Sequence, residues 1–501
     1  MTLTCSWQLP TSLNRDTVLS ALPSGMTAAP KSTQEVRVSV LDDDQWHICQ
    51  RGDLLLYNHQ DSRLELWQQQ QRLAQETRPL TIRFHWQLND PALAKLLQAR
   101  LGVRAFTEKF TSEWQQHHLS VYNSDDKIIV RLTFTTLNSV SRELLSLLTI
   151  QPLRGYAKEA RQLCRSLKKL GATPCDQLTP LQLLTLSGLN VPLPRHRPPF
   201  NLHDDEVTAV AIMRMVGQIV EQARAQEEGL IADIDSEFLH QYRVQLRKAR
   251  SLVSLFKKDL PEPAFHQLKS SLKELSQHTN LLRDLDVFLL DHDHYLTMLP
   301  ESLRPGLEQA CRHIHRLRKR TWQKVITALD SADHRDKMDE INQAMTAPRL
   351  QPRGKKLKQR VDHHIVRQHR HICTSVSTLS TSCSDDAIHQ LRIECKKLRY
   401  LLELFAELYP RKPLKVLTRE LKALQETLGR FNDFTVQHQF LHQLAGELRD
   451  SDQKSSLNAL SALLYQAQKQ EKKQVFSILS TFDCDETTSR VHQLLAYGEP
   501  S

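Results

Sequence analysis

One stretch of the sequence carries a histidine and three arginines at the spacing of a single helix face. These residues are His240, Arg243, Arg247 and Arg250. On a helix with about 3.6 residues per turn, offsets of 0, 3, 7 and 10 fall within an arc of roughly 80°. Arginine can hold phosphate oxygens in a bidentate fork, and cations stacked on one face repel one another unless an anion lies on them. The spacing therefore predicts a polyanion-binding face.

A second series with the same spacing belongs to an internal repeat. Residues 240–287 align without a gap with residues 389–436, at an offset of about 149. A solvated helix face would not need the same register of histidine and arginine twice, so the repeat favours binding. The first histidine of each series could equally be a core or capping residue that orients an arginine. The second series is His389, Arg392, Lys396 and Arg399.

Further basic residues recur at helical spacing outside these two series. Some follow a proline break in each copy, and we expect their helices to form the opposite wall of a basic groove. Others lie farther on, and for these a solvated helix face is an equal alternative. The first group is Lys269, Lys273, Lys415, Arg419 and Lys422, and the second group is Arg316, Arg320, Lys324, Lys469 and Lys473.

Acidic residues near these series are predicted to cap helices or to orient basic side chains. Asp284 and Asp286 have Asp433 and Thr435 at the equivalent positions of the second copy, so a carboxylate pair is not repeated. The nine cysteines form no CxxC pair, and Cys311 with His315 is the least unsuitable pair for a metal. We expect neither a metal nor a cofactor.

Composition places the chain among globular, helix-rich proteins with more than one domain. It has 501 residues, with 67 Lys and Arg against 57 Asp and Glu and a formal net charge of +10. This charge allows an anionic partner without requiring one. The sequence contains no apolar stretch long enough for a transmembrane helix and no export signal, which favours a cytoplasmic location.

A proline-rich run divides the chain. Residues 191–202, VPLPRHRPPFNL, read as a linker because proline fixes φ and removes hydrogen-bond donors. Before it, residues 1–190 show short alternating segments followed by helical patterns, which predicts an α+β domain. After it, residues 203–501 read as amphipathic helices in two copies, about 203–346 and 353–490.

The paired segments HQYRVQLRKARSLVSLFK with LLRDLDVF, and HQLRIECKKLRYLLELF with LGRFNDFTV, resemble the CHAD domain. The resemblance covers about residues 203–490. It implies an all-α domain of two four-helix bundles that binds inorganic polyphosphate through basic residues lining a central pore. It implies that role for His240, Arg243, Arg247, Arg250, Lys273, His389, Arg392, Lys396, Arg399 and Lys422.

The first half is similar to a degenerate CYTH domain, a triphosphate tunnel built as an antiparallel β-barrel with helices. RVSVLDDDQWHICQRGDLLLYNHQDSRLELW has the outline of its early strands. The alternating glutamates expected at the start are replaced by LTCSWQL, the basic strand by Leu54 to Tyr57, and the acidic closing strand by a segment with Thr149 and Gln151. Such a domain would not hold the Mg²⁺ that phosphoryl hydrolysis needs, which makes it a pseudo-enzyme.

The sequence thus predicts a non-catalytic polyphosphate-binding protein, with polyphosphate granules as one location within the cytoplasm. Two alternatives stay open. One is an active inorganic triphosphatase with altered metal ligands such as Asp42, Asp43, Asp44 and Glu143. The other is a nucleic-acid-binding protein, for which aromatics at 6% offer few stacking surfaces.

Overall fold

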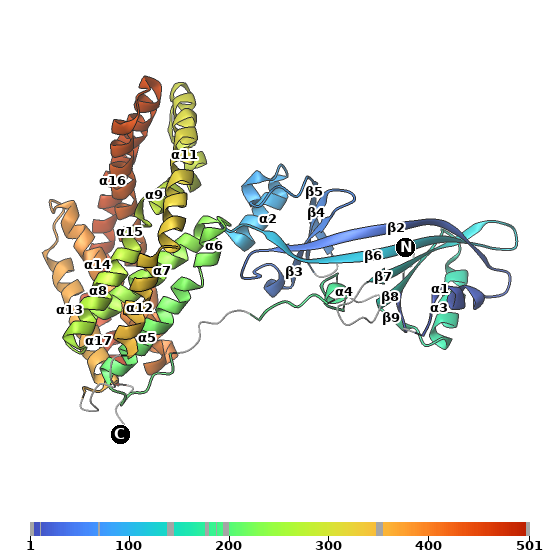
Figure 1. Ribbon diagram of the computed structural model, residues 1–501, viewed down its shortest axis with the longest axis horizontal. Helices are drawn as coiled ribbons and strands as arrows, with labels where there is room; N and C mark the ends of the chain where they lie inside the picture. Colours follow the sequence, from blue (N-terminus) through green and yellow to red (C-terminus); the bar gives the residue numbers. More distant parts are fainter. Residues whose placement is uncertain are drawn as a thin grey trace. The chain divides into compact units, whose positions relative to one another are not determined.

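The computed structural model describes residues 5–10, 12–68, 71–137, 145–175, 180–186, 188–193, 200–346 and 354–496. The chain divides into two compact units, residues 1–197 and 198–501 (Figure 1). The first unit contains an antiparallel sheet with helices and the second is helical, which confirms the predicted α+β class. Part of the proline-rich run (194–199), the break at 347–352 and Glu143 lie outside the described residues.

The first unit is built on a single sheet of nine strands. Their order is β5-β4-β3-β2-β6-β7-β8-β1-β9, and every neighbouring pair is antiparallel. The strands are β1 (Cys5–Leu9), β2 (Thr27–Asp42), β3 (Asp53–Asn58), β4 (Arg63–Gln68), β5 (Gln71–Thr77), β6 (Thr107–Tyr122), β7 (Ile128–Leu137), β8 (Leu145–Pro152) and β9 (Thr173–Pro174).

Two long strands, β2 and β6, carry the other strands at opposite ends. β3 pairs with Val38 to Leu41 of β2, whereas β7 pairs with Trp114 to Tyr122 of β6, whose partners in β2 begin at Thr27. Each end has its own apolar core. The helices α1 (Arg15–Ser20) and α3 (Ala157–Lys169) cover one end, and α2 (Pro91–Leu101) covers the other, with α4 (Pro180–Leu186) on the opposite face of that end.

The sheet has the antiparallel pairing expected of a β-barrel with helices, but its described strands do not close into a ring. The sheet ends at β5 and β9, and no pairing between described strands joins these two edges. The physical reason is the length of the paired strands β2 and β6, which keeps the strands beside β3 and the strands beside β7 apart. The two groups of flanking strands pack against separate cores at its two ends, so they do not curl towards one another.

The second unit repeats its helices in order. The helices α5, α7 and α8 begin at residues 208, 236 and 262, and α13, α14 and α15 begin at 357, 385 and 411, each 149 residues later. The helices of the first copy are α5 (Thr208–Arg224), α6 (Glu227–Ile231), α7 (Ser236–Leu255), α8 (Glu262–Gln277), α9 (Asn280–Leu290), α10 (His292–Met298), α11 (Arg304–Leu329) and α12 (Ala332–Thr346). Those of the second copy are α13 (Leu357–Thr378), α14 (Asp385–Leu404), α15 (Arg411–Glu447), α16 (Ser451–Thr481) and α17 (Cys484–Ala496).

Four helices of each copy close into a bundle. In the first copy α5, α7, α8 and α12 pack in a ring, and α13, α14, α15 and α17 do the same in the second. The bundles meet through α7 with α14 and α5 with α13, and they share one apolar core that includes Leu252, Phe256, Leu401 and Phe405. The predicted pair of four-helix bundles is therefore present.

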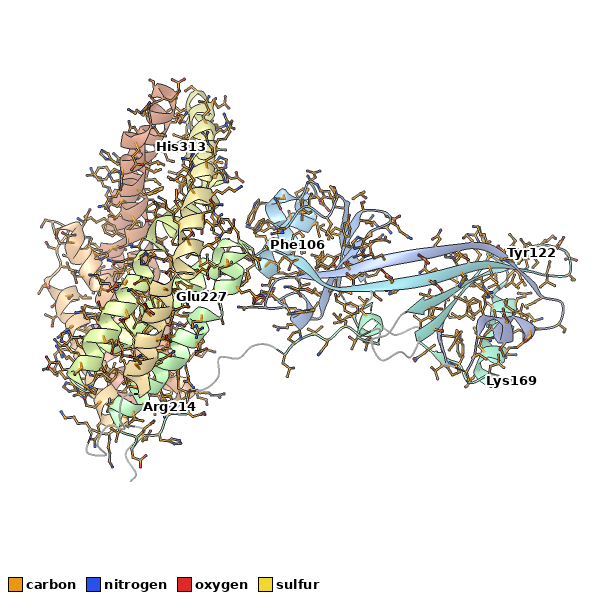
Figure 2. The ribbon with its side chains drawn as sticks, viewed as in Figure 1. Phe106, Tyr122, Lys169, Arg214, Glu227 and His313 are labelled. Carbon is orange, nitrogen blue, oxygen red and sulfur yellow. The ribbon has the colours of Figure 1, made fainter. Side chains whose placement is uncertain are left out.

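The remaining long helices extend beyond the bundles. α11 packs against α9 and α16 around a separate core that includes Leu307, Ile314 and Leu460. In Figures 1 and 2, α11, with His313 labelled, and α16 project beyond the other helices of this unit. The two copies differ at two places. The helices α8, α9 and α10 are separate, whereas their counterpart α15 continues unbroken for 37 residues, and the short helix α6 has no separate counterpart after α13.

The contact between α11 and α16 requires a glycine at residue 306. A Cβ added to Gly306 would lie 2.3 Å from Ser456 Oγ and 2.6 Å from the Asp452 carbonyl oxygen, whereas a Cβ at Gly429 in α15 would meet nothing within 4 Å. We expect Gly306→Ala to lower the free energy of unfolding by about 1–3 kcal/mol through overpacking.

Gly429→Ala should instead raise it by about 0.5–1 kcal/mol, because alanine has the higher helix propensity. Urea unfolding followed by circular dichroism compares the two variants. An unchanged midpoint for Gly306→Ala would show that α11 and α16 do not approach this closely.

Candidate polyanion-binding site

A cavity of about 1070 Å³ lies within the helical unit. It is lined by α7 and α9 of the first copy and by α13, α14 and α15 of the second, so both copies of the repeat contribute to it. Its described lining contains eight Arg and Lys side chains and four carboxylates. The cavity is therefore positively charged even with its histidines neutral.

The structure brings most of the two predicted series together in this cavity. All four residues of the α7 series line it, namely His240, Arg243, Arg247 and Arg250. From the α14 series, Arg392 and Lys396 line it as well. The helical register in the sequence placed these side chains on one face, and the packing of α7 beside α14 joins the two faces.

Two residues of the α14 series have other partners and are not among the lining residues. His389 shares a hydrogen bond between its Nδ1 and Asn432 Oδ1 (2.7 Å), and Asn432 does line the cavity. Arg399 Nε lies 3.4 Å from Glu403 Oε1. His389 therefore contacts an asparagine of the cavity wall, whereas the alternative left open for it was a residue that orients an arginine.

Arg243 is fixed by the break between α8 and α9. Its Nη1 donates to the Ser276 carbonyl (3.1 Å), to Thr279 Oγ1 (2.7 Å) and to Asn280 Oδ1 (2.8 Å). The interruption of the helix thus exposes a backbone carbonyl and two side-chain acceptors that an unbroken helix would not present. Burial, reinforced by the charge of Arg247, lowers the pKa of Arg243 to about 10.

The α14 side of the cavity carries a buried lysine among arginines. Burial, followed by the charges of Arg392, Arg247 and Arg399, lowers the pKa of Lys396 to about 7. Burial likewise lowers the pKa of Arg392, whose Nη2 lies 3.8 Å from Asp433 Oδ1. A single distant carboxylate thus offsets little of the positive charge here.

Four arginines face the cavity with neither an ion pair nor a side-chain hydrogen bond to any described residue. They are Arg247, Arg250, Arg283 and Arg367. Their guanidinium groups keep their hydrogen-bond donors available for a ligand in the cavity.

Residues 214–442 match the family model of the CHAD domain, and the cavity residues named above lie within that range. The chain contains a CHAD domain. Among solved structures, it is similar to the CHAD domain from the plant Ricinus communis, with 23% identity over 56% of this chain and 95% of that chain and a TM-score of 0.49. It is also similar to PptA from Streptomyces chartreusis, with 14% identity over 55% and 98% of the two chains and a TM-score of 0.42. No curated protein matches the chain.

The CHAD cavity also contains basic residues that the sequence analysis missed. Arg283 lines it from α9, but its repeat partner is Asn432, so comparing the copies gave no matching cation. Arg367 has Gln218 at the equivalent position and was missed for the same reason. Helical spacing of 3 and 4 in His364, Arg367 and His371 was the available signal. Lys397, the remaining addition, pairs with Glu394 (2.8 Å).

The aspartates near the cavity contact or neighbour basic side chains. Asp284 and Asp433, which are equivalent in the repeat, both line the cavity. Burial raises the pKa of Asp284, and the charges of Arg243 and Arg283 oppose that shift. Asp286 is instead buried away from the cavity and accepts a hydrogen bond from Arg318 Nε (2.6 Å). These contacts agree with the predicted orienting role.

The structure corrects the predicted opposite wall. In place of α8 and the first half of α15, the walls facing α7 and α14 are α9, α13 and the second half of α15. Leu268 and Leu272 turn the apolar face of α8 into the bundle, so its lysines project into water. The five residues assigned to that wall are exposed and do not line the cavity: Lys269, Lys273, Lys415, Arg419 and Lys422.

The weaker candidates also lie outside the cavity lining. All five are exposed: Arg316, Arg320 and Lys324 on α11, and Lys469 and Lys473 on α16.

Cys311 and His315, the pair considered as metal ligands, differ in their exposure to solvent. Cys311 is buried in an apolar core, which raises its thiol pKa to about 12, whereas His315 is exposed. No cluster of three or more metal-ligating side chains occurs among the described residues.

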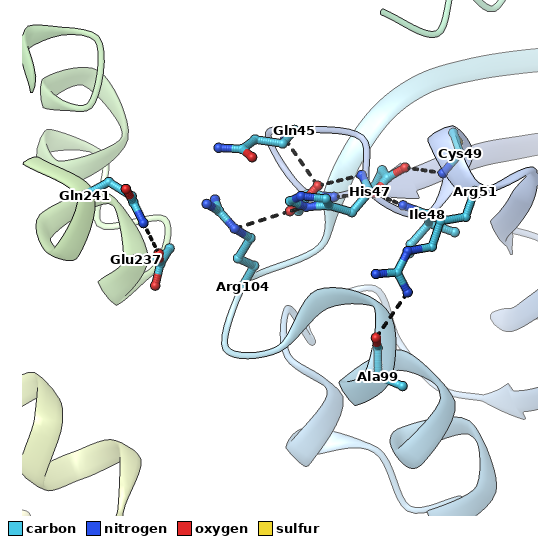
Figure 3. A network of polar contacts seen from close by, with 11 residues as sticks. Gln45, His47, Ile48, Cys49, Arg51, Ala99, Arg104, Glu237 and Gln241 are labelled. Atoms are coloured by element: carbon cyan, nitrogen blue, oxygen red, sulfur yellow. Dashed lines mark hydrogen bonds and ion pairs between the residues drawn. The ribbon is translucent and has the colours of Figure 1, made fainter. Parts of the chain in front are cut away.

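Two carboxylates of the first unit organise the loop after β2. Asp42 accepts backbone N–H bonds from Asp43 (2.8 Å), Ile48 (3.0 Å) and Cys49 (2.8 Å). Asp43 accepts from the backbone of Gln45 and His47, and Arg104 Nε approaches it at 3.5 Å (Figure 3). Both carboxylates are fully buried, and these contacts occupy their oxygens.

No helix in the described part of the chain is long and apolar enough to cross a bilayer.

The depressed pKa of Lys396 makes stability depend on pH. Its pKa is about 7 in the folded protein against 10.5 for an ordinary lysine, so between these values the unfolded chain binds one more proton. The charged form therefore destabilises the fold, fully below pH 7 and progressively less as pH rises towards 10.5.

We expect Lys396→Met to stabilise the protein more at about pH 6 than at about pH 9.5. Urea midpoints at the two pH values measure this difference, with exposed Lys273→Met as the matched control. A gain for Lys396→Met that is equal at both pH values would contradict the expected pKa.

Proposed function

We propose that the CHAD domain of this chain binds inorganic polyphosphate in its cavity. The observation that carries the proposal is the presence of Arg247, Arg250 and Arg367 in the cavity without ionic partners. Arginine forks suit phosphate oxygens, and a ligand with negative charge at every unit matches cations contributed by four helices, α7, α9, α13 and α14. The likeness to CHAD domains supports the same ligand.

The energetics of the cavity cations support a polyanion as the ligand. Burial and mutual repulsion lower the pKa values of Arg243 and Lys396, so the fold holds these positive charges at a cost in free energy. Charge brought in by a polyanion offsets that repulsion and favours the protonated form of Lys396. A neutral ligand offers no such compensation.

We propose further that the first unit is not catalytic. Its sequence resembles a degenerate CYTH domain, and the acidic closing strand of such a domain is replaced here by one that contains Thr149 and Gln151. Asp42 and Asp43 hold their own loop, so using them as metal ligands would require that loop to rearrange.

Two arginines on α7, Arg247 and Arg250, have neither an ion pair nor a side-chain hydrogen bond to a described residue, and they provide the sharpest test of polyphosphate binding. Replacing Arg247 and Arg250 by glutamine leaves no described partner unsatisfied, and each lost charge-assisted bond costs about 1.5–3 kcal/mol. Arg247→Gln with Arg250→Gln should therefore lower polyphosphate affinity by about 100-fold or more.

Isothermal titration with polyphosphates of graded length measures the loss, and far-ultraviolet circular dichroism verifies the fold. Lys269→Gln with Lys273→Gln removes the same charge outside the cavity and should change affinity little. Equal losses in the two variants would place the ligand elsewhere. Competition against a labelled oligonucleotide tests the nucleic-acid alternative, because polyphosphate should displace it far better than the reverse.

A phosphate-release assay separates a non-catalytic first unit from the triphosphatase alternative. We expect the full-length protein to release no phosphate from tripolyphosphate in the presence of Mg²⁺. Asp42→Asn should lower the free energy of unfolding by about 1–3 kcal/mol, because it weakens three buried N–H bonds. Mg²⁺-dependent release that is lost in a folded Asp44→Asn variant would instead establish a triphosphatase.

A further inference from the structure

The outer face of α11 carries a second concentration of positive charge. We call it the α11 basic strip, and all of its residues are exposed. No acidic residue occurs in the sequence between Glu308 and Asp330, so the helix supplies no counter-charge of its own along the strip. The strip consists of Arg312, Arg316, Lys319, Arg320 and Lys324.

The α11 basic strip is not neutralised by neighbouring helices. None of its five side chains forms an ion pair with another described residue. Elsewhere in the unit, basic residues on helix surfaces often do, as Lys337 does with Asp333 (2.7 Å) and Glu274 (3.0 Å). The positive charge of the strip therefore remains available to an external partner.

The strip faces away from the polyphosphate cavity. Arg318 on the inner side of α11 donates to Asp286 on α9 (2.6 Å). At 100° per residue, Arg316 and Arg320 point about 160° away from Arg318. Because α9 forms a wall of the cavity, the strip lies on the far side of α11 and is a separate surface.

The strip is also absent from the second copy of the repeat. The buried residues of α11 and α16 align at an offset of 150, as in Leu307 with Leu457 and Val325 with Val475. At this offset only one of the five equivalent positions in α16 is basic, Lys469, whose Nζ lies over the ring of Tyr465 at 4.4 Å. The cavity residues, by contrast, mostly recur in both copies. The strip therefore serves something other than the function that the two copies share.

The chemistry of α11 narrows the class of partner. None of the large hydrophobic side chains exposed in the described structure lies on α11, which disfavours insertion into a membrane. The single aromatic residue of this helix, Trp322, is partly buried and donates its Nε1 to the Leu230 carbonyl (2.9 Å), so it is not free for base stacking. Recognition here must depend on charge.

We propose that the α11 basic strip binds the phosphate backbone of duplex nucleic acid without reading its sequence. Arg312, Arg316, Arg320 and Lys324 recur every four residues, about 6 Å apart along a helix face about 18 Å long. Duplex DNA presents one charge per about 1.7 Å of its axis, and contacts to phosphate alone give salt-dependent, sequence-independent affinity.

Fluorescence anisotropy with a labelled DNA duplex of about 20 base pairs and arbitrary sequence tests the proposal, between about 50 and 200 mM salt. The test variant of the full-length protein replaces Arg312, Arg316, Lys319 and Arg320 by glutamine. At the lowest salt its affinity should fall at least about 10-fold, and the slope of log affinity against log salt should decrease by about 3 to 4.

The matched control replaces four other exposed cations without described ion pairs, Lys269, Lys273, Lys415 and Arg419, by glutamine and so changes net charge equally. We expect duplex affinity to fall less than about 3-fold in this control and in the Arg247→Gln, Arg250→Gln cavity variant. Circular dichroism confirms that each variant is folded.

Three outcomes would overturn the proposal: no duplex binding by the unaltered protein at about 50 mM salt, equal losses in the test and control variants, or loss in the cavity variant. Binding to phosphatidylserine vesicles but not to the duplex would also overturn it and would point to a membrane surface. The experiment measures affinity for the labelled DNA duplex. A protein that fails to bind polyphosphate could therefore still show the expected loss of duplex affinity in the test variant.

Discussion

The repulsion among cations that face one another across a cavity is the constraint on which the helical unit depends. Arg243, Arg247, Arg392 and Lys396 are brought together with few carboxylates nearby. Water cannot fully screen partly buried charges, and the lowered pKa values of Arg243, Arg392 and Lys396 express that cost. The apolar core shared by the two bundles supplies the opposing stabilisation, since burial of its leucine and phenylalanine side chains holds α7 and α14 in place. The protein thus retains positive charges in positions that only an anion would make favourable.

The two copies of the repeat hold similar side chains by different means. Arg243 is held by acceptors at the break between α8 and α9. Arg392 of α14 instead has one ion-pair partner among the described residues, Asp433 on the continuous helix α15. α13 adds Arg367 on one side without an arginine at the equivalent position of α5. The cavity therefore departs from two-fold symmetry although the helices around it repeat, and its two halves present different side chains. The α11 basic strip extends this asymmetry to the outer surface.

In the first unit, the buried carboxylates Asp42 and Asp43 stabilise the fold by hydrogen bonds to backbone N–H groups. Asp42 and Asp43 are buried and bind the loop between β2 and β3, and the sheet remains open because its two ends pack on different cores. A closed tunnel concentrates inward-facing charges around one axis. An open sheet with separate cores does not create such an enclosure, which is a physical reason to look for anion binding in the helical unit.

The sequence by itself determined the helical repeat, its register and the basic faces of α7 and α14. Helix periodicity fixes which side chains share a face, and the offset of 149 residues shows that the pattern occurs twice. It also indicated the α+β character of the first unit. Tertiary structure decided which faces meet. Lys269 and Lys422 satisfy the same spacing rule as Arg247, yet they face water, because the leucines of their own helices fill the bundle interior. Arg283 and Arg367 reach the cavity only because α9 and α13 pack beside α7 and α14, and periodicity along one helix carries no information about its neighbours.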